Sequence, residues 1–289
     1  MPFLIVTTVI WSFSFSLIGV YLAGQVDPWF SILMRVGLAT LLFVPFMRFS
    51  GTSVKACIAF MAAGACQLGI MYLFYYQSFL YLTVPEVLLF GITMPIYVTL
   101  IYDLLKGQSL RWGYLFSALL AVLGAGVINF SHPRENFWFG MLIIQTANFF
   151  FALGQVGYKR AMELYPMPSR QSSALFYLGA LCVAIVAWLL LGNVEQLPTT
   201  SVQWGILVWL GLGASGIGYF MWNYGAGKVD AGTLAIMNNA MIPVGLMVNF
   251  LIWQEQPEWG KTLAGGAIML LSLWIHKRWV VIEDKMVKA

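Results

Sequence analysis

Residues 3–22, FLIVTTVIWSFSFSLIGVYL, form a run of 20 residues without a charged side chain. At a rise of about 1.5 Å per residue, a helix of this length crosses the ~30 Å hydrocarbon core of a bilayer. No lysine or arginine precedes the run, and further apolar runs follow it. We therefore expect a membrane helix that stays in the mature protein and not a cleaved signal peptide.

The whole chain shares the composition of this run. Of its 289 residues, 61% are hydrophobic and 9% are charged, whereas a soluble domain carries about 25% charged residues. This composition leaves too few polar side chains for a water-facing surface and excludes a soluble globular protein. The basic residues behind the net charge of +4 are spread over loops and ends, so they form no patch for nucleic acid.

Nine further apolar runs follow the first. Their cores are residues 29–47, 56–74, 82–101, 111–129, 138–157, 172–191, 205–222, 232–251 and 261–279. The gaps between them hold most of the proline, glycine and charge. We therefore predict an all-α membrane protein with ten transmembrane helices.

Lysine and arginine residues predict the orientation of these helices, because they concentrate in cytoplasmic loops. With the N-terminus in the cytoplasm, twelve of the fifteen basic residues lie in cytoplasmic loops or the tail. Only Arg134 and Lys261 lie in outer loops, and Arg35 lies inside a span. We expect both termini in the cytoplasm.

The sequence also repeats itself at an offset of about 147 residues. The matched pairs are Arg111-Trp112-Gly113 with Glu258-Trp259-Gly260, Gly69-Ile70-Met71-Tyr72 with Gly216-Ile217-Gly218-Tyr219, and Pro95 with Pro243. Each copy holds five spans, and since five is odd, the second copy enters the membrane inverted. We predict two inverted five-helix repeats over residues 1–134 and 135–280, a cytoplasmic tail over 281–289, and hinges at the two prolines.

Several segments resemble the EamA-type repeat of the drug/metabolite transporter superfamily. They are Arg35 near the start of the second span, residues 216–226 (GIGYFMWNYGA), Ala231-Gly232-Thr233 and the mid-helix Pro243. The resemblance covers the whole chain and implies a transporter with a central cavity between the two halves. Most members have a polar patch in the first helix, where this chain has residues 11–15 (WSFSF). The resemblance therefore implies an aromatic wall at that place.

Other segments are similar to one branch of that superfamily, the biotin permeases of enterobacteria. They are Tyr21-Leu22-Ala23-Gly24, Leu80-Tyr81-Leu82-Thr83, Gly157-Tyr158-Lys159-Arg160, Val229-Asp230-Ala231-Gly232-Thr233 and Met237-Asn238-Asn239. This similarity implies a small organic anion, biotin, as the substrate. It also implies a multi-pass protein of the bacterial inner membrane.

Two ionisable side chains, Arg35 and Glu86, lie inside predicted spans. Such groups cost roughly 3 kcal/mol in a bilayer and indicate a functional site by default. Arg35 either recognises a substrate carboxylate through its forked donors or ties helices together through Glu86 or backbone carbonyls. Glu86 either carries a coupling proton or serves in an ion pair or as a partly hydrated residue at the outer mouth.

Amide side chains at helical spacing form a second class of candidates. Gln145 and Asn148 share one helix face, and Phe90 shares another face with Glu86. Asn238 and Asn239 shortly precede Pro243, where loosened backbone requires a neighbouring cavity. These groups either offer donors and acceptors to a ureido or amide group of the substrate or hold helices together.

A third class lies in helices that line the central cavity in the superfamily. Its members are Trp11 and Phe15 in the first span, Gln67, Tyr72 and Tyr75 in the third, and Tyr219, Trp222 and Asn223 in the eighth. Each of these side chains either contacts the substrate or packs in the core. Gly211, Gly213 and Gly216 have the spacing of a dinucleotide fingerprint, but within an apolar helix they indicate close helix packing.

These features favour a secondary active importer of biotin that works by alternating access as a monomer or weak dimer. Import of a monoanion against a negative interior costs about 2.3 kcal/mol per 100 mV, so we expect a co-transported proton. The alternatives are an exporter of amino acids or related metabolites and a non-transporting membrane subunit. The spans hold neither a nucleophile with a base nor a metal cluster, so we expect no enzyme and no cofactor.

Overall fold

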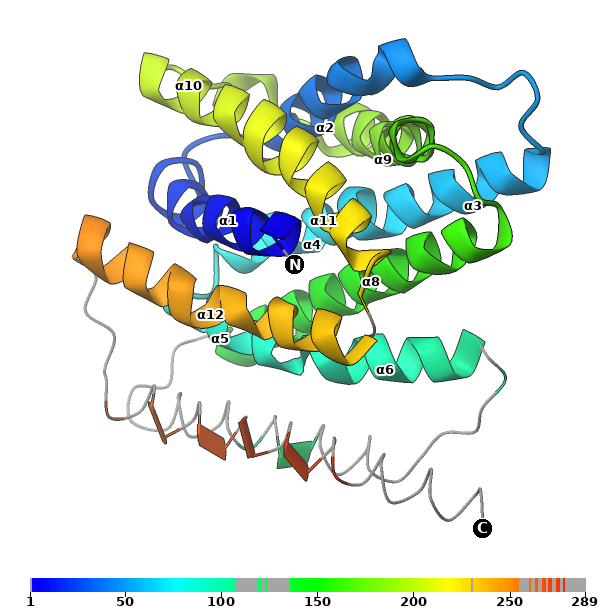
Figure 1. Ribbon diagram of the computed structural model, residues 1–289. Helices are drawn as coiled ribbons and strands as arrows, with labels where there is room; N and C mark the ends of the chain where they lie inside the picture. The colour runs from blue at the N-terminus through cyan, green and yellow to red at the C-terminus, as the bar shows by residue number, and fades with distance from the viewer. Residues whose placement is uncertain are drawn as a thin grey trace.

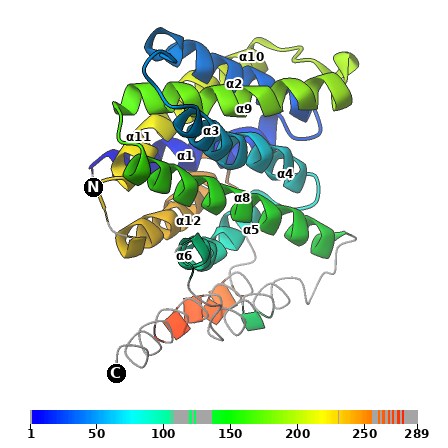
Figure 2. The ribbon, with the colours of Figure 1, turned by 90° about the vertical axis from the view of Figure 1, so that its right-hand side faces the viewer.

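The computed structural model describes residues 2–105, 136–229 and 231–254, with scattered residues between 107 and 123 and between 260 and 278. For residues 231–236 and 239 it describes the backbone alone. Every element in the described part of the chain is helical. The helices cross the molecule in stacked layers, with α2 and α9 towards one side and α12 and α6 towards the other (Figure 1, Figure 2).

The described helices match eight of the ten predicted spans, and the other two predicted spans, 111–129 and 261–279, lie largely outside the described residues. The helices are α1 (Pro2–Tyr21), α2 (Pro28–Phe43), α3 (Val54–Gly64), α4 (Met71–Ser78), α5 (Val84–Phe90), α6 (Met94–Leu105), α8 (Phe137–Leu164), α9 (Ser169–Leu191), α10 (Ser201–Trp209), α11 (Tyr219–Ala226) and α12 (Ala231–Trp253). Short segments join or extend them: η1 (Val44–Phe46), η2 (Ala65–Ile70), η3 (Gly91–Thr93), η4 (Val194–Gln196) and η5 (Leu210–Gly218). Seven helical segments of the described part are long and apolar enough to cross a membrane.

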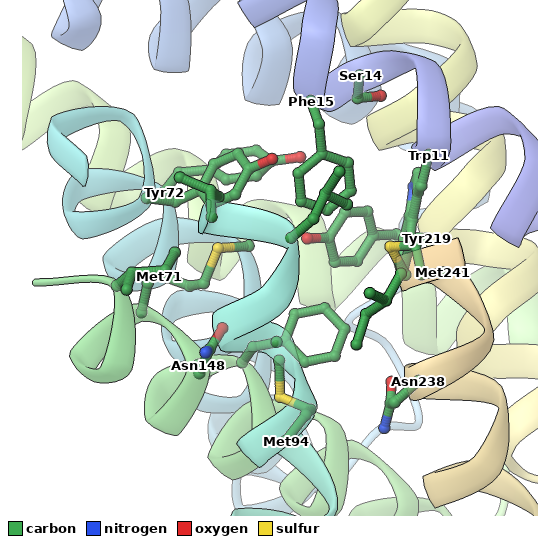
Figure 3. Close-up of a pocket in the computed structure, with 18 of the residues that line it drawn as sticks. Trp11, Ser14, Phe15, Met71, Tyr72, Met94, Asn148, Tyr219, Asn238 and Met241 are labelled. Atoms are coloured by element: carbon green, nitrogen blue, oxygen red, sulfur yellow. The ribbon is translucent and has the colours of Figure 1, made fainter. Parts of the chain in front are cut away.

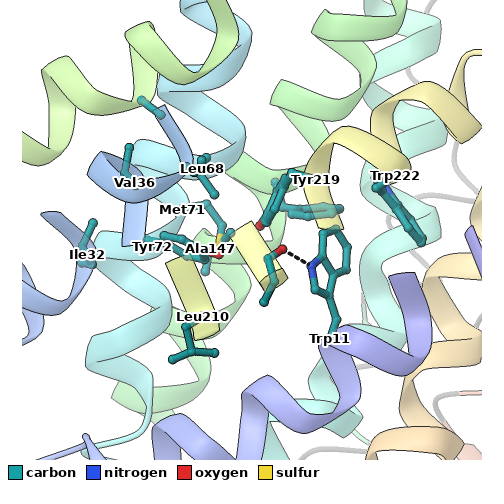
Figure 4. Packing of buried hydrophobic residues seen from close by; sticks show 14 of the residues in the cluster. Trp11, Ile32, Val36, Leu68, Met71, Tyr72, Ala147, Leu210, Tyr219 and Trp222 are labelled. Carbon is teal, nitrogen blue, oxygen red and sulfur yellow. Dashed lines mark hydrogen bonds between the residues drawn. The ribbon is translucent and has the colours of Figure 1, made fainter. Parts of the chain in front are cut away.

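The outer surface of the bundle is apolar, as a lipid solvent requires. Leu189 and Leu190 of α9 are 75% and 76% exposed, and large hydrophobic side chains are exposed on most other helices as well. So many exposed large hydrophobic side chains are unusual on a water-soluble monomer. Inside, a large cluster of buried side chains joins residues from α1 to α12. Figure 4 shows part of it, with labelled residues from Trp11 of α1 to Trp222 of α11.

Two spans widen into π-helical turns at equivalent positions. The segment η2 separates α3 from α4, and η5 separates α10 from α11. They end at Ile70 and Gly218, inside the matched motifs of the sequence repeat. A π turn inserts an extra residue into a helix and often marks a functional site.

Glycines in or next to the two π turns allow close helix contacts. A side-chain carbon at Gly64 would lie 1.8 Å from the carbonyl oxygen of Phe176 in α9, and one at Gly211 would lie 2.8 Å from α2. Gly69 and Gly216, five residues further on, face the same two helices. Both pairs are separated by the offset of the sequence repeat. The interpretation of Gly211 and Gly216 as packing residues is thus confirmed.

Helix packing between the two halves is reciprocal. The span α3–η2–α4 packs against α8 and α9, and the span α10–η5–α11 packs against α1 and α2. In the same way, α6 packs on α8, α12 packs on α1, and α2 and α9 pack on each other. Each of these contacts therefore has a counterpart in which the equivalent helices of the two halves are exchanged.

The fourth predicted span is broken and the ninth is not. A 3₁₀ turn, Gly91–Thr93, separates α5 from α6 just before Pro95, whereas α12 continues through Pro243. Proline lacks an N–H and cannot donate to the carbonyl one turn earlier. In the fourth span the helix tightens into a 3₁₀ turn, in which the Met94 N–H bonds to the Gly91 carbonyl. In an α-helix this N–H would bond to the Phe90 carbonyl, which is therefore available to other donors.

Candidate functional site

A cavity of about 100 Å³ lies inside the bundle, between helices of both halves (Figure 3). Its lining includes eight of the predicted site residues: Trp11, Phe15, Arg35, Tyr72, Tyr75, Asn148, Tyr219 and Asn238. The rest of the lining is mainly aliphatic, aromatic and methionine side chains, among them Met71, Met94 and Met241. An apolar cavity with a few convergent polar groups is the usual form of a small-molecule site.

Arg35 is the only cation in the described lining of this cavity, and it is 2% exposed. Its Nη2 donates to the Tyr72 hydroxyl at 2.7 Å, and its Nη1 donates to the Tyr76 hydroxyl at 3.2 Å. Its Nε donates to Ser215 Oγ at 3.1 Å. The guanidinium also lies over the Tyr72 ring, 4.3 Å from the centroid. Arg35 thus connects α2 to the two spans that carry π turns.

The hydrogen-bond partners of Arg35 in the described part of the chain are all neutral. They include neither Glu86 nor a backbone carbonyl, the two partners through which the sequence hypothesis lets Arg35 link helices. Hydroxyls and a ring face solvate the guanidinium, but they leave its formal charge unbalanced. A buried charge is costly unless a counter-charge pairs with it. The cavity beside Arg35 is therefore a favourable place for an anion.

Tyr76 and Ser215 were not singled out from the sequence. Ser215 lies in η5, where the widened turn brings its Oγ within 3.1 Å of Arg35 Nε and 3.0 Å of the Tyr72 hydroxyl. A serine in a glycine-rich helix resembles a packing residue, so no sequence signal distinguishes it. Tyr76 follows Tyr72 by one helical turn, and this spacing is the one signal that was available.

Trp11, Phe15, Phe151 and Tyr219 form an aromatic wall of the cavity, and Trp222 packs against Trp11 outside the lining. The Trp11 ring centroid lies 4.6 Å from that of Tyr219, 5.0 Å from that of Trp222 and 6.0 Å from that of Phe151. The Trp11 Nε1 donates to the Ala214 carbonyl of η5 at 2.8 Å (Figure 4). The wall therefore joins α1 to the π turn of the eighth span.

Three of the predicted residues outside the cavity lining, Gln67, Trp222 and Asn223, make two buried hydrogen bonds. Gln67 Nε2 donates to Asn223 Oδ1 at 3.2 Å, and Trp222 Nε1 donates to Gln155 Oε1 at 3.0 Å. Gln67 Oε1 and Gln155 Nε2 have no hydrogen-bond partner among the described residues. The structure thus pairs Gln67 with Asn223 and Trp222 with Gln155, and none of these side chains lines the cavity.

Gln145 and Asn148 of α8 form hydrogen bonds to the backbone at the break in the fourth span. The Phe90 carbonyl, left free by the 3₁₀ turn, accepts from Asn148 Nδ2 at 3.0 Å and from Gln145 Nε2 at 3.3 Å. Gln145 Oε1 accepts from the hydroxyls of Thr93 and Tyr97. Gln145 and Phe90 therefore hold helices together here and do not line the cavity, whereas Asn148 does both.

Glu86 caps the helix α5. Its Oε2 accepts from the Thr83 N–H at 2.7 Å and from the Thr83 hydroxyl at 2.9 Å, which forms a capping box. The side chain is 8% exposed and is not part of the described cavity lining.

Two buried polar atoms in the cavity lining have no hydrogen-bond partner among the described residues, Ser14 Oγ and Asn238 Nδ2. Buried polar groups in native proteins are nearly always paired, so a ligand or a water molecule in the cavity would satisfy these two atoms. Ser14 was not predicted as a site residue. Asn238 was, together with Asn239, whose side chain lies outside the described residues.

Comparisons with known proteins agree with this architecture. The model of the family described as "EamA-like transporter family" matches residues 1–130 and 138–276. The chain is 56% identical to the "Biotin transporter" of Escherichia coli (strain K12), with 97% of this chain and 94% of that protein covered. It is 57% identical to the "Biotin transporter" of Salmonella typhimurium, with the same coverage, and 48% identical to the "Probable biotin transporter" of Pseudomonas aeruginosa, with 96% and 97% covered. A solved structure described as "Crystal structure of protein" is similar in fold, with a TM-score of 0.66 at 16% identity and 95% of each chain covered.

Proposed function

The chain belongs to the EamA-like transporter family, and we propose that it imports biotin across the bacterial inner membrane by secondary active transport. Its relatives at 48–57% identity that carry the name of biotin transporter support this substrate. Arg35 carries the proposal in the structure, because a buried and unbalanced guanidinium beside a cavity suits a carboxylate. Biotin has one carboxylate, at the end of an apolar pentanoate chain.

The proposed architecture is two inverted five-helix repeats, over residues 1–134 and 135–280, with both termini in the cytoplasm. Reciprocal packing supports it, because a two-fold axis in the membrane plane exchanges the helices of the two halves in this way. The glycines at the repeat offset and the two π turns support it as well.

Alternating access is the mechanism we propose for this architecture. The broken fourth span and the two π turns adjoin the cavity, and such irregular segments are where helices bend most readily. Rocking of one bundle against the other would then expose Arg35 to each side of the membrane in turn.

The experiment that tests the function is uptake of labelled biotin in cells that neither make biotin nor hold another permease for it. We expect this chain to restore accumulation. An exporter would instead drive net flux outwards in vesicles, and a non-transporting subunit would show neither uptake nor thermal stabilisation by biotin. Either outcome would refute the proposal.

We propose proton coupling with Glu86 as the carrier, and Glu86→Gln tests it cleanly. Glutamine also serves at this position of a capping box, so the variant keeps the helix cap while it removes the ionisable group. We expect biotin binding to persist and concentrative uptake to fall to the level that an uncoupler leaves in the wild type. Accumulation by Glu86→Gln at the wild-type level would remove Glu86 from the coupling mechanism.

A further inference from the structure

We infer that Asn148 and Asn238 form a ureido-binding site, so that biotin lies with its bicyclic ring between these two amides and its carboxylate at Arg35. The inference rests on the proposed function and adds the orientation of the substrate. In Figure 3, Asn148 and Asn238 flank Met94 at one end of the cavity. Tyr72, which bonds to Arg35, lies towards the other end with Ser14.

Asn238 supplies the unpaired donor. It is 6% exposed, it lines the cavity from α12, and its Nδ2 has no hydrogen-bond partner among the described residues. A ligand carbonyl that accepts from this Nδ2 satisfies a buried donor, which a purely apolar ligand does not. The contact therefore discriminates between ligands as well as adding affinity.

Asn148 supplies a fixed acceptor. Its Nδ2 is held by the Phe90 carbonyl at 3.0 Å, a carbonyl that the break in the fourth span sets free. This bond uses one of the two N–H donors of the amide and fixes Nδ2 towards Phe90, so Oδ1 is the acceptor that Asn148 offers to a ligand. The irregular helix thus fixes the orientation of the amide.

These two groups match the ureido ring of biotin. The ring offers one carbonyl acceptor and two N–H donors, whereas a carboxylate offers acceptors alone. The carbonyl accepts from Asn238 Nδ2, and an N–H donates to Asn148 Oδ1. Methionines Met71, Met94 and Met241 supply soft apolar surface around the sulfur ring. The cavity therefore has one charged and one amide end, as biotin does.

Competition against labelled biotin on the purified full-length protein tests the orientation with two probes. Biotin methyl ester keeps the ureido ring without the carboxylate charge, and lipoate keeps the pentanoate and a five-membered sulfur ring without the ureido group. We expect Asn238→Ala to weaken biotin and its methyl ester by about tenfold each, the effect of one hydrogen bond, and lipoate by less than about twofold. Asn249→Ala is the matched control, because Asn249 lies in the same helix and is buried but bonds to Ser16 away from the cavity.

Two results separate the inference from the proposed function. Failure of the wild-type protein to bind biotin would refute the function itself. If the wild type binds biotin but Asn238→Ala weakens biotin and lipoate by the same factor, the function stands and the ureido site is overturned. Asn238→Leu provides a second variant of similar volume, and it should discriminate against biotin as Asn238→Ala does, because it lacks the donor and adds no charge.

Discussion

Replacing Arg35 by alanine is expected to abolish biotin uptake and to weaken biotin binding at least a hundredfold. A hydrogen bond to a charged group contributes roughly 1.5–3 kcal/mol, and a forked guanidinium makes two such bonds to a carboxylate. Their loss corresponds to about 3 kcal/mol or more, where each 1.4 kcal/mol is a factor of ten. Arg35→Lys is expected to recover only part of this loss, because an ammonium lacks the planar fork that meets both oxygens.

Biotin methyl ester makes this prediction specific to the charge. The ester has no anion to pair with Arg35, so Arg35→Ala should change its binding far less than that of biotin. Arg160→Ala is the matched control, since Arg160 pairs with Glu163 on an exposed helix surface. The Arg160→Ala protein should bind biotin as tightly as the wild type does. Equal losses for acid and ester would mean that Arg35 acts only through the hydroxyls of Tyr72, Tyr76 and Ser215 that it holds.

The helices of the bundle were predictable because lipid selects apolar side chains along each span. Predicted and observed limits differ where helices continue into water. The span expected to end near residue 157 continues to Leu164, through Lys159, Arg160 and Glu163. Hydropathy marks the part of a helix that lies in the hydrocarbon core and not the end of the hydrogen-bonded helix. The predicted span is therefore shorter than the observed helix.

The site was predictable where one residue type has few alternatives inside a membrane. Arg35 qualifies, because a cation in a span needs a reason to be there. Ser215 and Ser14 do not qualify, since serine hydroxyls are also common in helix packing. The hydrogen bond between Ser215 and Arg35 depends on the extra residue of a π turn, which the sequence does not reveal. Gln145 shows the opposite case, because the sequence leaves open a substrate contact or a tie between helices, and in the structure its amide bonds to the broken helix.

Substitutions at Gly64 and Gly179 are expected to destabilise the folded bundle by about 3 kcal/mol or more each. A side-chain carbon at Gly64 would lie 1.8 Å from the Phe176 carbonyl oxygen, and one at Gly179 would lie 1.9 Å from the Met61 carbonyl oxygen. Backbone atoms have no rotamer that relieves such a clash, so α3 and α9 must separate. Helices in lipid associate through close packing of this kind, and separation forfeits those contacts.

Gly37→Ala is the matched control, because a side-chain carbon at Gly37 in α2 has no neighbour within 4 Å. Alanine favours a helix over glycine by roughly 1 kcal/mol, so this variant should melt at or above the wild-type temperature. We expect Gly64→Ala and Gly179→Ala to melt well below it in detergent and to yield less monodisperse protein. If all three variants melted together, the close approach of α3 and α9 would not stabilise the fold.

The same clash is expected to reach the substrate site, because Gly64 and Tyr72 belong to one continuous span. Separation of α3 from α9 displaces η2 and α4, which carry the Tyr72 and Tyr76 hydroxyls that bond to Arg35. Any Gly64→Ala protein that still folds should therefore bind biotin more weakly at low temperature, before it unfolds. Gly64→Ala protein that folds and binds biotin as tightly as Gly37→Ala would show that the packing of α3 does not position the partners of Arg35.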